Sequence, residues 1–171
     1  MKVCFPPIAD KNAKVLILGT MPGEESLRKK QYYAHPRNAF WYIMERLLNI
    51  DSKASYEKRK SILKVNHIAL WDVLMSCERE GSLDSSIRDT SIVTNDFALF
   101  FSEHPHIKSV YFNGAKAEQE YMKRVLPVIA DEFKGIEYFR LPSTSPAMAK
   151  LTKDEKFSHW SIIMDKLKRQ S

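Results

Sequence analysis

The chain has 171 residues, 44% of them hydrophobic, and a formal net charge of +6 at pH 7. This length suits a single domain spanning residues 1–171, and the absence of any apolar run near about 18 residues argues against a membrane helix. The only cysteines, Cys4 and Cys77, exclude a four-cysteine metal or iron–sulfur site and indicate reduced thiols in a cytoplasmic protein. The basic charge favours a polyanionic partner such as nucleic acid.

Four short apolar segments predict β-strands. They are Val15–Thr20, Ile68–Trp71, Ser109–Phe112 and Ile136–Leu141. Such continuous apolar runs, separated by helical segments, are typical of a parallel sheet that is buried on both faces. The expected fold class is therefore α/β, a three-layer domain with helices on both sides of a four-stranded sheet.

The helical segments show apolar residues at helical spacing. One helix is expected to begin at Asn38, and a second, short one is expected to be capped by Asn95. A third ends near Pro127, and a single last helix starts at a capping box formed by Thr152 and Glu155.

The first candidate site segment is Gly19-Thr20-Met21-Pro22-Gly23, which directly follows the first predicted strand. A glycine at each end lets the backbone turn sharply and approach a flat ligand, and Pro22 stiffens the turn. In open α/β sheets, ligands bind at this carboxyl end of the strands. We therefore expect Gly19, Thr20, Met21, Pro22 and Gly23 to contact a base, although a turn without any ligand would have the same sequence.

The second segment, residues 31–38, leads into the predicted helix. Tyr33 could stack on a planar base, whereas ordinary packing is expected for Tyr32. Asn38 stands where a helix N-cap is expected, and its amide could alternatively hold a water or a base carbonyl. His35 and Arg37 are candidates for phosphate contacts; His35 could equally bond within its own loop.

The third segment, residues 141–147, follows the last predicted strand. Two prolines enclose three hydroxyl side chains, which gives a stiff loop suited to phosphate contacts or to pressing against a duplex; a plain turn is the alternative. The DNA-binding candidates here are Pro142, Ser143, Thr144, Ser145 and Pro146. Asn113, at the end of the third strand, could contact a base or cap the next helix.

The polar stretch 78–94 predicts a long loop of the kind that often carries function. Asp72, Glu78, Asp84 and Asp89 are the carboxylates nearest the end of the second strand. Any of them could orient a water molecule, and each could simply be solvated. No metal site is expected, since His104 and His106 lack acidic or cysteine partners at ligand spacing.

Taken together, the three segments resemble the uracil-DNA glycosylase superfamily, and within it the hypoxanthine-DNA (deoxyinosine) glycosylase branch. Gly19–Gly23 resembles the first motif of the superfamily, residues 31–41 (QYYAHPRNAFW) resemble the signature of the branch, and Leu141–Ala147 resembles the second motif. Residues 70–74 and 77–84 are also similar to the branch, so that the resemblance covers essentially the whole chain.

The resemblance implies a parallel sheet of strand order 2-1-3-4 and removal of a deaminated base from DNA. It also implies a catalytic role for Asn38 and stacking of Tyr33 on the extruded base. The chain departs from relatives that carry Asn, Asp or Glu in the first motif, because Thr20 and Met21 stand there. It also has Leu141 where a His or Asn often opens the second motif.

The sequence thus predicts a monofunctional, monomeric DNA-deoxyinosine glycosylase without cofactors that acts on double-stranded or single-stranded DNA. Hypoxanthine is the expected base, with uracil or xanthine as further substrates. Two alternatives remain: a non-catalytic DNA-binding module of the same fold, and a nucleoside or nucleotide hydrolase.

Overall fold

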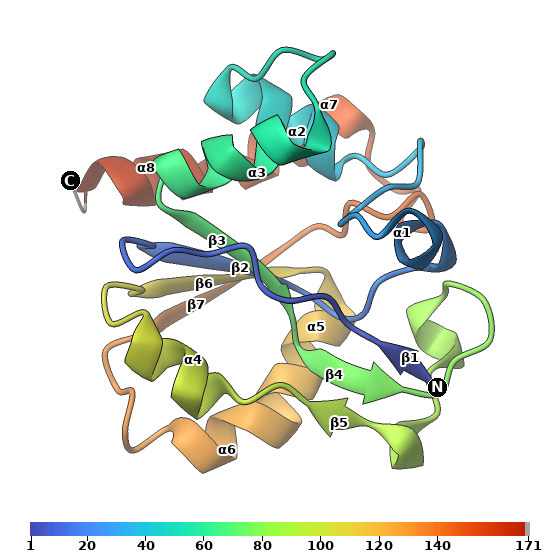
Figure 1. The fold of residues 1–171 in the computed structure, drawn as a ribbon, viewed down its shortest axis with the longest axis vertical. Coiled ribbons are helices and arrows are strands. Elements are labelled where there is room, and N and C mark those ends of the chain that lie inside the picture. Colours follow the sequence, from blue (N-terminus) through green and yellow to red (C-terminus); the bar gives the residue numbers. More distant parts are fainter. Residues whose placement is uncertain (170–171) are drawn as a thin grey trace.

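The computed structural model describes residues 1–169. Four parallel strands form the central sheet: β2 (Val15–Gly19), β3 (Ile68–Asp72), β6 (Ser109–Asn113) and β7 (Glu137–Leu141). Their order in the sheet is β3-β2-β6-β7 (Figure 1), which confirms the order 2-1-3-4 and the α/β class expected from the resemblance. The strands differ from the predicted bounds by one residue at an end; Thr20 and Ile136, for example, lie outside them.

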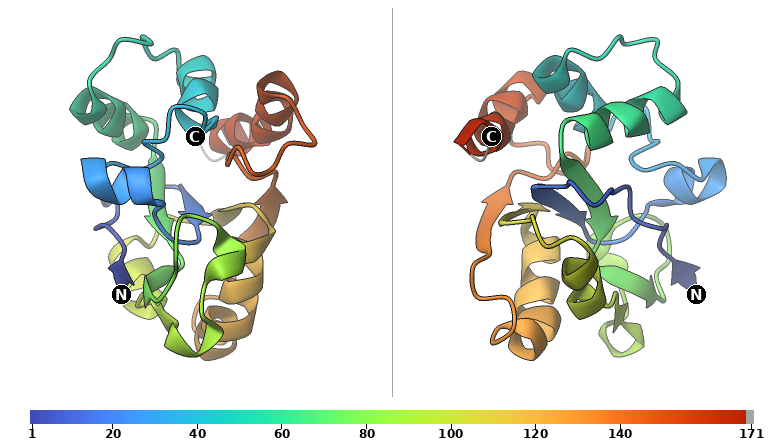
Figure 2. Two further views of the ribbon diagram at one scale, coloured as in Figure 1. Left: turned by 90° about the vertical axis from the view of Figure 1, so that its right-hand side faces the viewer. Right: turned by 60° about the vertical axis from the view of Figure 1, so that its left-hand side comes forward.

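Helices cover both faces of this sheet (Figures 1 and 2). On one face lie α2 (Phe40–Leu48), α3 (Tyr56–Val65), α7 (Lys153–Trp160) and α8 (Ile162–Arg169). On the other lie α4 (Phe97–Glu103), α5 (Ala115–Glu120), a π-helical turn (Tyr121–Val125) and α6 (Leu126–Ile129). The short helix α1 (Glu24–Lys29) follows β2.

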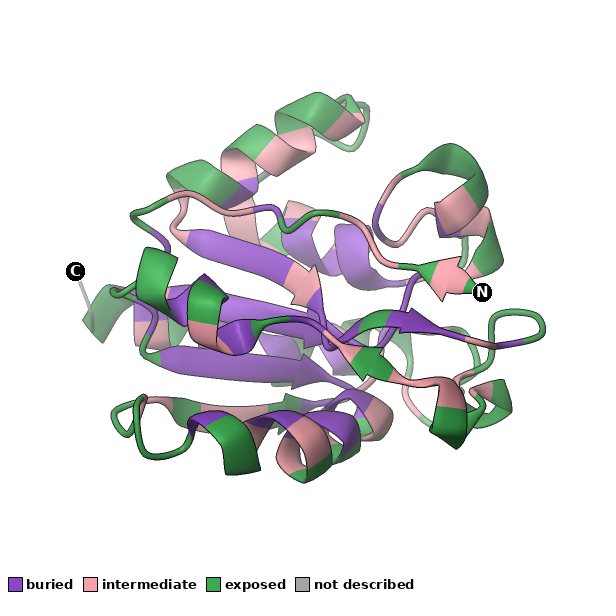
Figure 3. Cartoon of the chain, turned by 60° about the horizontal axis from the view of Figure 1, so that its bottom comes forward, coloured by how far each residue is buried: buried purple, intermediate pink, exposed green. Residues whose placement is uncertain are grey.

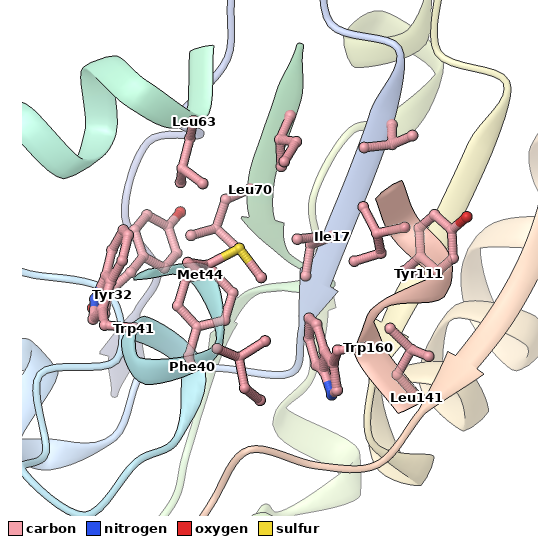
Figure 4. Packing of buried hydrophobic residues seen from close by; sticks show 14 of the residues in the cluster. Ile17, Tyr32, Phe40, Trp41, Met44, Leu63, Leu70, Tyr111, Leu141 and Trp160 are labelled. Carbon is pink, nitrogen blue, oxygen red and sulfur yellow. The ribbon is translucent and has the colours of Figure 1, made fainter. Parts of the chain in front are cut away.

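Alternating residues of β2 explain the two-sided burial. Val15 and Ile17 belong to a core with the α2, α3 and α8 side chains, whereas Leu16 and Leu18 belong to the core under α4 and α5. Figure 4 shows the first core, and Figure 3 shows the inner strands of the sheet as buried, whereas the edge strand β7 is only partly buried. Each of these aliphatic side chains contributes about 1.5–3 kcal/mol through burial, so β2 is firmly anchored on both faces.

Several element bounds differ from the sequence expectations. Asp96, not Asn95, caps α4, because the Asp96 carboxylate accepts a hydrogen bond from the Leu99 backbone N–H. The Asn95 amide instead donates to the Asp72 backbone carbonyl at 2.8 Å. The expected single last helix is two helices that meet at Ser161, although the capping box at its start is confirmed.

The helix expected to end near Pro127 continues to Ile129, because proline is tolerated in the first turn of α6.

A second, small antiparallel sheet was not predicted. It consists of β1 (Lys2–Val3), β4 (Leu74–Cys77) and β5 (Val93–Thr94). The predicted loop 78–94 therefore ends in a strand, and it also contains two 3-10 turns, Asp84–Ser86 and Asp89–Ser91. This sheet holds the loop beside the carboxyl ends of the parallel strands (Figure 1).

Among residues 1–169, no helix is both long and apolar enough to cross a membrane.

Candidate functional site

The candidate segments meet at one edge of the sheet. Because β2, β3, β6 and β7 are parallel, the residues that follow them emerge together at their carboxyl ends. The site is therefore built from the loop Gly19–Gly23, the end of β3 at Asp72, the end of β6 at Asn113, and the loop 141–147. The segment 31–38 joins them through the start of α2.

The loop Gly19–Gly23 turns its side chains inward. Thr20, Met21 and Pro22 are buried, and the Thr20 hydroxyl donates to an Asp84 carboxylate oxygen at 3.1 Å. The Arg79 guanidinium donates to the Pro22 carbonyl, and its Nε donates to the Gly81 carbonyl at 3.0 Å. The loop is therefore held by two side chains of the segment 78–94.

Position 19 requires glycine because two polar side chains approach its backbone closely. A Cβ at this position would lie 2.5 Å from Asp72 Oδ1 and 2.7 Å from the Tyr33 hydroxyl oxygen. Both distances are far below van der Waals contact, so only glycine fits here without displacement. The Asp72 carboxyl and the Tyr33 hydroxyl thus converge on the backbone of the first motif.

Tyr33 has a left-handed backbone conformation with φ of 54°, which is uncommon for an aromatic residue. Its ring stacks on Phe40 with 4.2 Å between centroids and an interplanar angle of 27°. The residue is half-buried, but its hydroxyl is buried and has no hydrogen-bond partner among the described residues. Burial and the nearby Asp72 carboxyl raise the pKa of this phenol, with the Asn113 side chain acting in the opposite direction.

Asn38 is half-buried just before α2. Its Oδ1 accepts a hydrogen bond from the Phe40 backbone N–H at 2.9 Å, which satisfies one of the free donors at the helix start. Ala39 occupies the N-cap position itself, so α2 begins two residues after Asn38 rather than at it. The capping role weighed from the sequence is thus visible, and it leaves the amide N–H₂ group of Asn38 for a further contact.

The loop 141–147 is docked against the sheet through Thr144, which is 1% exposed. The Asn113 amide donates to the Thr144 hydroxyl at 2.9 Å and accepts from the Thr144 backbone N–H at 2.9 Å. The Thr144 carbonyl accepts from the Ala39 N–H, also at 2.9 Å. These bonds join the end of β6, the second motif and the start of α2 into one unit beside Asn38.

Other bonds fix the rest of this loop. The Trp160 indole donates to the Pro142 carbonyl at 2.9 Å, and Lys156 donates to the Ser145 carbonyl at 3.1 Å. Ser143 packs against Gly114, where a Cβ would approach the Ser143 Cβ to 3.0 Å. Pro146 at the tip is exposed, so the loop presents a rigid outer surface.

The two basic candidates, His35 and Arg37, are exposed beside Asn38. The Arg37 backbone N–H donates to His35 Nδ1 at 3.1 Å, so part of the His35 ring serves its own loop, as one of the two sequence alternatives predicts. Both side chains remain accessible to phosphate. Tyr32, in contrast, is packed as expected: it is buried, and its hydroxyl donates to the Pro6 carbonyl at 2.9 Å.

Two carboxyl groups in the site are perturbed. Burial, and secondarily the nearby Asp84 carboxylate, raise the pKa of Asp72 to about 7, while Arg79 opposes this shift. Burial also raises the pKa of Asp84, against the hydrogen bond from Thr20 and the charge of Arg79. Carboxyl groups whose pKa is raised in this way occur often at functional sites.

A groove of about 420 Å³ lies on the outer side of the segment 31–38. It is lined in part by His35, Asn38, Tyr42 and Lys153. Gly19, Asp72 and Asn113, which lie at the carboxyl ends of the strands, do not line this groove. Of the candidate residues for contact with the base, only Tyr33 and Asn38 also line it.

Sequence reasoning left Asp72 as one of four equivalent carboxylates and missed Arg79 altogether. Asp72 could have been singled out, because it is the only one of the four that directly follows a predicted strand. Arg79 has no such signal: a basic residue in a polar loop is ordinarily solvated, and its buried position depends on the fold of the segment 78–94. Within residues 1–169 there is no group of three or more His, Cys, Asp or Glu residues that could hold a metal ion.

The comparisons with known proteins agree with this geometry. Residues 6–168 match the family model of the "Uracil DNA glycosylase superfamily". Two curated relatives, both named "Hypoxanthine DNA glycosylase", come from Methanosarcina barkeri and Methanosarcina acetivorans. They are 39% and 40% identical to the chain, over 92% and 93% of its length and 94% and 95% of their own.

A solution NMR structure from Methanosarcina acetivorans, described as a candidate uracil DNA glycosylase, superposes with a TM-score of 0.79. It is 38% identical in sequence, and the match covers 98% of each chain. With the four-stranded sheet in the order β3-β2-β6-β7 and both motif loops at its carboxyl edge, the chain belongs to the uracil DNA glycosylase superfamily.

Proposed function

We propose that this chain is a monofunctional DNA glycosylase that removes hypoxanthine from DNA and thereby starts base excision repair. The observation that carries the proposal is that three features lie together at one edge of the sheet. They are Asn38, the loop Gly19–Gly23, and the loop 141–147 that Thr144 holds against the sheet. Two relatives named hypoxanthine DNA glycosylase are similar to this chain over more than nine-tenths of its length, and this similarity supports the choice of base.

The reaction requires the damaged nucleotide to leave the stack. Extrusion of a base costs a few kcal/mol, and less where the pair is mismatched, which favours an inosine opposite thymine. The rigid 141–147 loop, with Pro146 at its tip, presses on the duplex, and His35 and Arg37 contact phosphates. Partial or full single-stranded character of the substrate lowers the extrusion cost further.

At the carboxyl end of β2, the extruded base stacks on the Tyr33 ring face that does not contact Phe40. The free N–H₂ group of Asn38 holds the attacking water or the base. When the C1′–N bond breaks, its electron pair goes to the base, and the water oxygen bonds to C1′. The proton released by the water ends on the departing hypoxanthine, so that a sugar with a free 1′-hydroxyl and a neutral base are formed.

Asn113 serves this site through Thr144: both of its amide hydrogen bonds hold the second motif in place. Its contribution to base binding is a prediction, as are the monomeric state and the cytoplasmic location.

The experiment that tests the proposal measures strand cleavage after alkali in a labelled duplex with one inosine opposite thymine. Uracil-containing and undamaged duplexes and the free nucleoside inosine serve as comparison substrates. We expect cleavage of the inosine duplex. Activity on inosine nucleoside alone would favour a nucleoside hydrolase, and DNA binding without cleavage of any base would favour a non-catalytic module.

Two substitutions separate the chemistry of Asn38 from its capping bond. Asn38→Ala removes both functions, whereas Asn38→Ser keeps a side-chain oxygen that can cap α2. We expect both variants to lose about 10²–10³-fold in single-turnover rate, the range for removing one preorganised donor. Full activity in Asn38→Ser, with a loss only in Asn38→Ala, would assign the residue a capping role alone.

A further inference from the structure

Three buried polar atoms surround the loop Gly19–Gly23 without a hydrogen-bond partner among the described residues. They are the Tyr33 hydroxyl, Asp72 Oδ2 and Arg79 Nη1. Buried polar groups in folded proteins are nearly always paired, so unpaired ones call for a bound group or water as their partner. Their gathering at the carboxyl end of β2 and β3 marks the place where such a group binds.

Asp72 is the most informative of the three. It ends β3, is 3% exposed, and its Oδ1 lies against Gly19. The carboxyl faces Asp84 and Arg79 from the segment 78–94, Tyr32 and Tyr33 from the segment 31–38, and Cys4 from the N-terminal segment. Of these groups only Arg79 is cationic, and it also approaches Asp84 at 3.8 Å.

These surroundings favour the neutral acid. Burial and the Asp84 carboxylate together outweigh the Arg79 charge, which is why the pKa of Asp72 rises to about 7. A neutral carboxyl group carries one hydrogen-bond donor and one acceptor side by side.

Deaminated bases carry the complementary pattern. Hypoxanthine has a carbonyl oxygen next to a ring N–H, and uracil and xanthine share this lactam edge. Resting on the proposed function, we propose that Asp72, as a neutral acid, donates a hydrogen bond to the carbonyl oxygen of the extruded base and accepts one from the adjoining ring N–H.

This arrangement favours the leaving of the base as well as its recognition. When the C1′–N bond breaks, negative charge develops on the base and spreads onto the carbonyl oxygen. A donor aimed at that oxygen stabilises the charge, whereas an ionised carboxylate would repel it. A protonated aspartic acid that donates to a developing oxyanion is an established device in enzymes. Asp72 keeps its proton, and the balance of the hydrolysis is unchanged.

Ionisation of Asp72 removes the donor and therefore lowers the excision rate. Below the pKa of Asp72 the excision rate is constant, and above it the rate falls up to tenfold per pH unit as the donor is lost. Asp72→Asn keeps a donor and an acceptor at all pH values, so no ionisation at position 72 lowers its rate. Asp72→Leu, similar in size without either group, should cleave about 10²–10³-fold more slowly than the wild type does below the Asp72 pKa, and no ionisation at position 72 changes its rate.

The test measures single-turnover excision of hypoxanthine from an inosine duplex at saturating enzyme, between about pH 5.5 and 9, a range that brackets the raised Asp72 pKa. Because titration of the substrate affects all variants alike, the ratio of the wild-type rate to the Asp72→Asn rate isolates Asp72. We expect this ratio to fall as the pH rises through about 7. Asp131→Asn is the matched control: it makes the same carboxyl-to-amide change at an exposed position and should keep the wild-type profile.

A constant ratio across this range would overturn the inference. So would an Asp72→Leu variant that melts cooperatively and at about pH 5.5 cleaves within about threefold of wild type, far short of the loss expected for a missing donor. In either case wild-type activity on inosine would stand, and with it the proposed function. A wild-type enzyme that cleaves no inosine duplex at any pH would overturn the proposed function and the inference together.

Discussion

Asp72→Asn should stabilise the fold in a strongly pH-dependent way. The side chain is buried, with a pKa of about 7 in the folded state against 3.8 for an ordinary Asp. A carboxyl whose pKa is raised by folding binds its proton more tightly in the folded than in the unfolded chain. The contribution of Asp72 to stability is therefore greatest below about pH 4, falls as the pH rises towards about 7, and is constant above that.

The magnitude follows from the shift of about three pKa units. At about 1.36 kcal/mol per unit, ionisation of Asp72 costs the folded state about 4 kcal/mol. This is a large share of the roughly 5–15 kcal/mol that stabilises a typical domain. The Asn variant has the same shape and no ionisable group, so it escapes this cost.

The measurement is urea unfolding at about pH 4, 6 and 8 of the wild type, Asp72→Asn and the exposed control Asp131→Asn. The unfolding free energy of Asp72→Asn relative to wild type should rise by about 4 kcal/mol between about pH 4 and pH 8, while the control stays within about 0.5 kcal/mol. A difference that is independent of pH would refute the reasoning, because it would mean that the Asp72 carboxyl titrates normally in the folded protein.

Three further substitutions test how the site is built. Gly19→Ala should abolish excision by displacing Tyr33, whereas Gly135→Ala, which meets no atom within 4 Å, should leave both activity and melting temperature near wild type; equal activity of the two would show that the close approach is unimportant. Arg79→Gln should lower the unfolding free energy by about 3 kcal/mol, since it removes a buried cation that holds the Pro22 carbonyl; a change under about 1 kcal/mol in urea unfolding would contradict that role. Tyr33→Ala should weaken binding to a duplex with an extruded base by about 5- to 150-fold, the range for loss of one stacking contact, while Tyr33→Phe should retain it; equal affinities in a titration would count against stacking.

The architecture was predictable where one physical signal dominated. The strand candidates were short, largely apolar runs, and the sheet buries β2 and β6 on both faces as such runs require. The edge strand β7 is only partly buried, and Glu137 and Arg140 interrupt its apolar residues. The capping box at Thr152 was predictable for a similar reason, because its two hydrogen bonds involve residues only three apart.

Short or context-dependent features escaped prediction. β1 and β5 have two residues each, too few for any periodicity, so the small sheet could not be seen from the sequence. Asn95 and Asp96 are adjacent residues with similar capping preferences. The choice between them depends on the tertiary bond from the Asn95 amide to the Asp72 carbonyl, which local sequence does not encode.

Some polar groups of the site have hydrogen-bond partners within the protein and some do not, and this difference distinguishes structural residues from those proposed to bind the base. Asn113, Thr144 and Ala39 form hydrogen bonds with one another, and these bonds hold the loops. The Tyr33 hydroxyl and Asp72 Oδ2 are buried without such partners among the described residues, and an unsatisfied buried polar group costs about 1–3 kcal/mol. In a module that merely held DNA, Phe and Leu would fill the same space without that cost. A fold that keeps both groups unpaired beside Gly19 is therefore better explained by a base that completes their hydrogen bonds than by a surface that only contacts phosphates.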